Sequence, residues 1–478
     1  MAERNLKQQT KKGIYWKFAE QFSNNGIRFL IGIIMARLLS PTDYGTTALP
    51  AVFIAVATVF VGAGFGTAMV RKPELKEEDL STAFYYSITV GIIAYVILFC
   101  TSPWIADFYN IPVLKSLARI SALNFLFLPL VTPQNIILQR NLDFKTPAKI
   151  SVICRIVSGV IGITMALYGY GVWALVISST FSLFAEVVIK IYAVRWYPKT
   201  GWSRESFQYL WGFGNKLMGS RLLETLYNNI TPVVIGKFYT PADLGVYNRA
   251  KSYADMPSQQ ATDVLQGVTF PVFSKMQDNE ESLAHNYRRM LKVSAFVIFP
   301  ATMFLAALAR PLVLVIISAK WESCITLLQI ICFAMMWIPI HAINLNLLQV
   351  KGRSDWFLKL EIFKKIYGII ILAATLPFGL IVLCLGQVLS SLISLVVNTH
   401  YTGKLINCGF WTQMKDLFPT LSLSLAMFLI VWGITHIIPN MLLQIIIGGI
   451  VGITFYLGMA HMFKMDELND VKYMLQRK

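Results

Sequence analysis

The chain has 478 residues, of which 56% are hydrophobic and only 14% are Asp, Glu, Lys or Arg, and its formal net charge is +17. Soluble proteins typically contain about 25% charged residues, so this composition excludes a soluble domain. The basic excess does not indicate nucleic-acid binding, because the Lys and Arg residues punctuate long apolar stretches instead of clustering on a polar segment.

The apolar residues form successive stretches that are long enough to cross a bilayer. About 20 apolar residues span the hydrocarbon core as a helix. The sequence therefore predicts an all-α polytopic membrane protein with about fourteen transmembrane helices. The predicted crossings are residues 14–38, 46–70, 81–104, 113–138, 147–168, 172–195, 209–236, 244–274, 291–309, 323–349, 357–376, 380–403, 417–437 and 441–463.

Most of the Lys and Arg residues lie in alternate connections between these helices. The opposite connections at residues 107–112, 169–171, 377–379 and 438–440 contain none. Cytoplasmic loops carry the excess of Lys and Arg, so both termini are predicted to be cytoplasmic and the number of crossings even. The extracytoplasmic connections are too short to hold a catalytic domain.

A short motif occurs twice at an offset of 200 residues. Residues 37–45 read RLLSPTDYG and residues 237–245 read KFYTPADLG. In each copy the Ser or Thr is expected to cap the next helix, with Asp facing its free N–H groups. The repeat predicts two six-helix lobes, residues 1–200 and 201–405, related by a pseudo-two-fold axis along the membrane normal. Residues 406–478 would add two helices and a cytoplasmic tail. Paired lobes of this kind are the layout of an alternating-access transporter.

Ionisable residues inside the predicted spans concentrate on residues 14–38, 209–236 and 244–274. Each such residue costs several kcal/mol unless it faces water, a partner or a ligand, so these helices are expected to line a wet cavity. Guanidinium groups suit a diphosphate because their planar donors match phosphate oxygens. The candidate substrate-binding residues are Asn25, Arg28, Arg221, Asn228, Arg249 and Lys251. The candidates for coupling to Na⁺ or H⁺ are Glu20, Glu224, Asp255 and Asp263.

A structural alternative exists for these charges. Arg221 can pair with Glu224, and Arg249 with Asp255, so that the pairs only hold helices together. Glu186 and Lys190, one helical turn apart, are expected to form such a pair. The dispersed His and Cys residues predict no metal site and no disulfide, and the sequence predicts no catalytic residues and no cofactor.

Three segments resemble a known family. They are GIYW at residues 13–16, ARLLSPTDYG at 36–45 and IGKFYTPADLGVY at 235–247. In these segments the chain is similar to Wzx-type (WzxC-like) polysaccharide exporters of the multidrug/oligosaccharidyl-lipid/polysaccharide flippase superfamily.

The resemblance implies a flippase that moves a polyprenyl-diphosphate-linked oligosaccharide across the bacterial cytoplasmic membrane by alternating access. It also implies that Arg28 and Arg249, and less directly Lys251, contact the substrate. The expected partners are the lipid-linked oligosaccharide, bilayer lipids, a coupling ion and, among assembly proteins, a polysaccharide polymerase.

Three alternatives stay open from the sequence. The first is an ion-coupled multidrug-type antiporter of the same fold, although its pocket for cations should be net acidic. The second is a membrane polymerase or glycosyltransferase, and the short outer loops disfavour it. The third is a structural scaffold, which the intramembrane charge disfavours.

Overall fold

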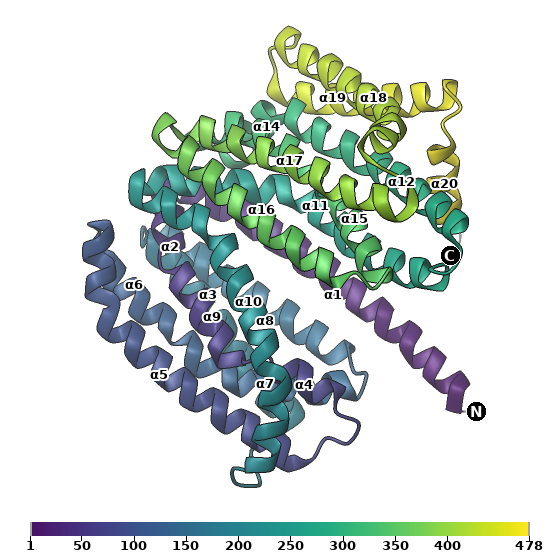
Figure 1. Cartoon of the computed structure of the whole chain (residues 1–478). Coiled ribbons are helices and arrows are strands. Elements are labelled where there is room, and N and C mark those ends of the chain that lie inside the picture. The colour runs from purple at the N-terminus through teal and green to yellow at the C-terminus, as the bar shows by residue number, and fades with distance from the viewer. Residues whose placement is uncertain (1, 477–478) are drawn as a thin grey trace. The chain divides into compact units, whose positions relative to one another are not determined.

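The computed structural model describes residues 2–476, with side chains outside the description at residues 2–15, 17–19, 22, 264, 267, 268 and 474–476. The described residues form helices and no strand (Figure 1). The α-helices are α1 (Ala2–Leu38), α2 (Pro41–Ala48), α3 (Ala51–Gly62), α4 (Phe65–Arg71), α5 (Glu77–Tyr109), α6 (Val113–Ala122), α7 (Asn124–Arg140), α8 (Lys145–Leu167), α9 (Val172–Val194), α10 (Arg204–Phe238), α11 (Pro241–Lys275), α12 (Glu280–Ala307), α13 (Ala309–Leu312), α14 (Cys324–Met335), α15 (Ile338–Val350), α16 (Ser354–Thr375), α17 (Leu380–Ile406), α18 (Phe410–Ile437), α19 (Met441–Met462) and α20 (Asp466–Gln476).

Ten segments in the described part of the chain are long and apolar enough to cross a membrane. They coincide with ten of the predicted crossings, and the predicted all-α polytopic membrane fold is confirmed. The other four predicted crossings are also helical, within α1, α10, α11 and α16. These four helices are long enough to cross a membrane, but they contain more polar and charged residues than the other ten. They therefore do not meet the hydropathy criterion for a span.

The chain divides into two compact units, residues 1–245 and 246–478. In the first unit, one core cluster joins α4, α5 and α10 through Phe65, Leu80 and Leu210. A second cluster joins α1, α8 and α9 through Met35, Ala166 and Ala174. The predicted division into lobes at residues 200 and 405 rests on the sequence repeat and stays a prediction.

The second unit is built around α12, which packs against α14, α15 and α18. Its core contains Phe299 of α12 and Ile340 of α15, together with Leu417 of α18 and Tyr456 of α19. The Tyr456 hydroxyl donates a hydrogen bond to the carbonyl of Phe296 at 2.9 Å. The helices α18 and α19, which follow residue 405, are therefore an integral part of this unit (Figure 1).

Both copies of the repeated motif form the predicted helix caps. The Ser40 hydroxyl accepts from the Asp43 backbone N–H at 3.2 Å, and the Asp43 carboxylate accepts from the Ser40 N–H at 2.9 Å. Thr240 and Asp243 make the same pair of contacts, at 3.2 and 3.1 Å. Each box satisfies backbone donors that the first helical turn leaves without an intrahelical partner.

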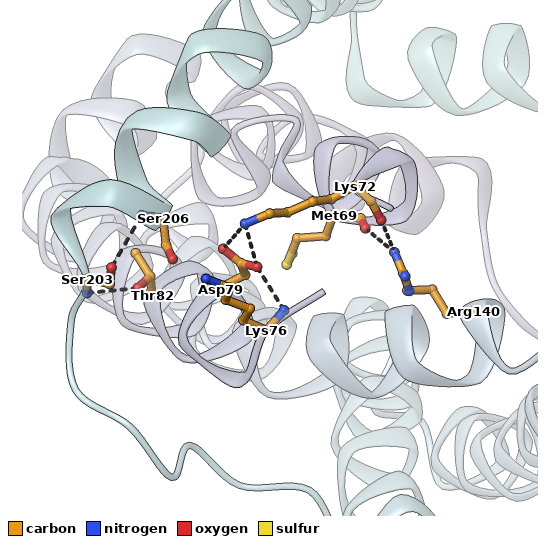
Figure 2. Close-up of polar contacts among 8 residues, drawn as sticks. All are labelled: Met69, Lys72, Lys76, Asp79, Thr82, Arg140, Ser203 and Ser206. Atoms are coloured by element: carbon orange, nitrogen blue, oxygen red, sulfur yellow. Dashed lines mark hydrogen bonds and ion pairs between the residues drawn. The ribbon is translucent and has the colours of Figure 1, made fainter. Parts of the chain in front are cut away.

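The connection between α4 and α5 is held by charged side chains (Figure 2). Asp79, fully buried, accepts from the Lys72 ammonium at 2.8 Å and from the Lys76 backbone N–H at 2.9 Å. Arg140 donates to the carbonyls of Met69 and Pro73, at 3.0 and 2.8 Å. These bonds use carbonyls at and beyond the end of α4, so this cluster fixes a connection between helices.

Candidate functional site

In the first unit, α1 and α8 bring polar side chains together inside the spans. The Ser151 hydroxyl lies 3.3 Å from the Glu20 carboxylate, to which it donates, and it accepts from Asn24 at 3.0 Å. Arg155 lies one turn along α8 from Ser151 and is within the electrostatic reach of Arg28, Glu186 and Glu20. The candidate residues Glu20 and Arg28 therefore belong to one polar cluster, which we call the first-unit cluster: Glu20, Asn24, Arg28, Ser151 and Arg155.

The predicted pair of Glu186 and Lys190 is confirmed. The Lys190 ammonium contacts the Glu186 carboxylate and also donates to the Asn135 amide oxygen at 2.5 Å. Lys190 is only 3% exposed, so its charge is compensated inside the protein. Asn135 is a polar partner that the sequence did not single out, because it lies on a different helix, 55 residues away.

The candidates on α10 share one helical face, as predicted. Arg221, Glu224 and Asn228 are all exposed. None of the ion pairs found among the described residues joins Arg221 to Glu224. Asn25 of α1 is partly buried.

In the second unit, Arg249 lies among aromatic rings. Its guanidinium carbon is 5.4 Å from the ring centre of Trp321 and 5.6 Å from that of Tyr253. Cation–π contacts of this kind hold a guanidinium in a fixed position while its charge is retained. Trp321 is fully buried in the connection that follows α13, so the contact depends on a residue 72 positions away in the sequence.

The remaining candidates also lie on α11. Lys251 and Asp255 are partly buried one turn apart, and the charge of Lys251 acts on the Asp255 carboxyl. Asp263 is exposed and accepts from the Gln259 amide at 2.9 Å. Arg249, Lys251 and Asp255 thus share a short stretch of one helix, while Asp263 lies two turns beyond it.

The sequence missed the neutral partners of these charges. Ser151 precedes Arg155 by four residues on α8, and that spacing on one helical face is a usable signal. Trp321 offers no such signal, because its contact with Arg249 joins separate elements. Among the residues with described side chains, no group of three or more His, Cys, Asp or Glu is placed to hold a metal ion.

Comparison with known proteins supports a single family. The sequence profile described as "polysaccharide biosynthesis protein" matches residues 34–326. The chain is 23% identical over 438 residues to the teichuronic acid biosynthesis protein TuaB of Bacillus subtilis, covering 90% of each chain. It is 25% identical over 451 residues to the lipopolysaccharide biosynthesis protein WzxC of Escherichia coli, covering 90% of this chain and 89% of WzxC.

The fold has a counterpart of nearly equal length among solved structures. The lipid II flippase MurJ, in an inward closed conformation, aligns with a TM-score of 0.75 at 15% identity, over 95% of this chain and 99% of MurJ. That similarity establishes the fold. Since the profile matches well over half of the sequence, the chain belongs to the polysaccharide biosynthesis protein family.

Proposed function

We propose that this protein is a flippase that moves a polyprenyl-diphosphate-linked oligosaccharide across the bacterial cytoplasmic membrane by alternating access. The oligosaccharide would be a repeat unit of an O-antigen, a capsule or an exopolysaccharide. The observation that carries the proposal is the family match over residues 34–326, a stretch that contains the intramembrane guanidinium groups of Arg155, Arg221 and Arg249. Relatives named for teichuronic acid and lipopolysaccharide biosynthesis support the same substrate class.

The chemistry of the candidate residues suits an anionic cargo. A diphosphate needs N–H donors and positive charge within a span, and arginine supplies both at once. The aromatic contacts of Arg249 hold its guanidinium in place, which lowers the entropy lost when a phosphate binds. We assign diphosphate or sugar contacts to Arg28, Arg249 and Lys251, with Arg221, Asn25 and Asn228 as further contacts.

The membrane potential can contribute to export. Moving each negative charge outward, down an inside-negative potential, releases about 2.3 kcal/mol per 100 mV. Glu20, Glu224, Asp255 and Asp263 remain proposed sites of additional ion coupling. Both termini would lie in the cytoplasm. The carrier would deliver its cargo to the outer side, to assembly proteins such as a polysaccharide polymerase. It would form no covalent bond itself.

Transport in proteoliposomes tests this function. Purified protein is reconstituted with a labelled lipid-diphosphate oligosaccharide, and the wild type is compared with the Arg28→Ala/Arg249→Ala double variant. Loss of a charge-assisted contact costs about 1.5–3 kcal/mol, so we expect the rate to fall by about tenfold or more. Arg353→Ala, which removes an arginine that is 39% exposed and paired with Asp355, is the matched control and should keep the wild-type rate.

The outcomes separate the alternatives. If the double variant transports as fast as the wild type, the assignment of the two arginines to the substrate site is wrong. A wild-type protein that moves no lipid-linked sugar, but exports organic cations in exchange for protons, would overturn the flippase in favour of a multidrug-type antiporter.

A further inference from the structure

The second unit contains a histidine at a break in a membrane span. The span Cys324–Val350 is interrupted where α14 ends at Met335 and α15 begins at Ile338. Pro339 occupies the first turn of α15, and His341 follows it. Transporters place their ion and substrate sites at interrupted helices near the bilayer midplane, and an ionisable residue at that depth is costly without a role. His341 therefore calls for an explanation.

The hydrogen bonds around His341 fit a neutral ring. The Asn398 Nδ2 group can only donate, and it lies 3.3 Å from His341 Nδ1, so Nδ1 accepts. The ring proton is then on Nε2, which donates to the Ser391 hydroxyl at 3.2 Å. The Ser391 hydroxyl in turn donates to the carbonyl of Ala334 at 3.1 Å. Each polar atom of the neutral ring thus has one partner.

The side-chain oxygen of Asn398 accepts no hydrogen bond in the contacts described above. Its side chain is buried, with the residue 1% exposed, and its Oδ1 atom has no hydrogen-bond partner among the described residues. A buried acceptor without a partner costs roughly 1–3 kcal/mol. Half a turn of the amide about its last torsion would bring Oδ1 to His341 Nδ1. The nitrogen must then carry a proton, and when Nε2 also keeps its proton the ring is an imidazolium with two acceptors.

The surroundings contain one charge that reaches the ring. Among the described residues on elements packed against α15, the Lys364 ammonium of α16 acts on His341, and it is paired with the Glu361 carboxylate at 2.5 Å. From α12, the Tyr287 hydroxyl faces α15 and donates to Asn344 at 2.8 Å. The groups from α14 and α17 are the neutral Ala334 carbonyl and the Ser391 and Asn398 side chains.

The groups around His341 act on its charged form in opposite directions. The Ala334 carbonyl lies in the last turn of α14, the negative end of that helix, and Asn398 Oδ1 supplies a second acceptor for a charged ring. The Lys364 ammonium disfavours a charged ring, and its pairing with Glu361 reduces that effect.

We propose that His341 is a proton-binding site. The Asn398 amide would donate to Nδ1 of the neutral ring and would rotate to accept from Nδ1 of the charged ring. The proposal rests on the flippase function and names its coupling ion as H⁺. Because His341 is on α15 and Asn398 on α17, each protonation state favours a different bond between two helices of the second unit. A ligand shifts a conformational equilibrium only through such differential contacts.

Transport under a pH gradient tests the coupling. Initial rates are measured in proteoliposomes with and without a gradient of one pH unit, at clamped zero membrane potential. If one proton is exchanged per substrate, a gradient of one pH unit can change the ratio of forward to reverse transport by up to about tenfold. We therefore expect the gradient to raise the transport rate of the wild type. In His341→Gln the ratio of the two rates should fall to about one, whereas His400→Gln, an exposed histidine on α17, should keep the wild-type ratio. A stimulated His341→Gln variant, or a wild type that transports without responding to the gradient, would overturn the proton site and leave the flippase function intact.

A second measurement does not depend on transport. Nitrogen NMR of ¹⁵N-histidine-labelled protein in nanodiscs, assigned by loss of the signal in His341→Gln, reports the tautomer. We expect a neutral Nε2–H ring at high pH that converts reversibly to imidazolium on acidification, and an Asn398→Leu variant should shift that conversion. A ring that never charges, or one that Asn398→Leu leaves unchanged, would refute the site even if no substrate is moved.

Discussion

Gly45 and Gly245 meet where the first turns of α2 and α11 cross. A Cβ atom on Gly45 would lie 1.6 Å from the carbonyl oxygen of Pro241, and one on Gly245 would lie 2.0 Å from that of Pro41. The contact is reciprocal, because position 41 touches position 245 while position 45 touches position 241. Reciprocity of this kind characterises contacts across a two-fold axis. The two copies of the motif therefore contact each other, while the division into two six-helix lobes stays a prediction.

Alanine at either glycine should destabilise the protein. Its methyl group would meet backbone atoms that cannot rotate away, and overpacking of this kind costs about 1–3 kcal/mol. Gly433→Ala, in α18, is the matched control, because a Cβ atom there would meet no atom within 4 Å. It should be neutral or stabilising, since Ala is the better helix former. Thermal unfolding in detergent measures the effect, and a Gly45→Ala variant as stable as the wild type would contradict the close crossing.

Asp416→Asn should loosen α18 from α12. The Arg288 guanidinium donates to both carboxylate oxygens of Asp416, at 2.6 and 2.7 Å, and the Asp416 side chain is only 6% exposed. Removing the charge weakens two charge-assisted bonds, so we expect a loss of about 1.5–3 kcal/mol in the free energy of unfolding. Denaturant titration gives this value. Asp355→Asn removes a carboxylate that is 52% exposed, and its cost should stay below about 1 kcal/mol; equal costs would argue against the role of the buried pair.

Acid should release α20 from α12. The hydrogen bond from Arg289 lowers the pKa of Asp470 against the opposing effect of burial, and the arginine charge adds to the lowering. A lowered pKa contributes stability that is complete above the unfolded value of about 3.9 and is lost as the pH falls through the folded value. Hydrogen exchange of residues 466–473, corrected for its intrinsic pH dependence, should therefore rise below about pH 4. Asp470→Asn should raise it already at neutral pH, and an unchanged rate there would show that other contacts hold α20.

Gln413→Leu should destabilise the second unit. The Gln413 amide nitrogen lies 3.0 Å from both the Tyr287 and the Thr402 hydroxyl oxygens, and all three residues are fully buried. Leucine would leave these groups without that partner in a low-dielectric site, at a cost of about 1–3 kcal/mol. Gln349→Leu, at an exposed position on α15, serves as control. If both variants unfold at the same denaturant concentration, the buried network is not stabilising.

The sequence by itself determined the features that depend on neighbouring residues. Apolar length identified ten segments able to span a membrane, and the motif around Ser40 and Thr240 specified two helix caps. The ion pair of Glu186 and Lys190 follows from a spacing of four residues on one helix. Helical geometry fixes such contacts once the helix forms, so they can be predicted before the fold is known.

Only the tertiary structure decided which distant residues meet. The crossing of Gly45 with Gly245, the rings around Arg249 and the bond between His341 and Asn398 join positions on separate elements. In the sequence His341 is one of five dispersed histidines, because nothing local marks the serine and asparagine that α17 brings to it. Packing selects these contacts through the shape and burial of whole helix faces, and no short-range sequence pattern encodes that choice.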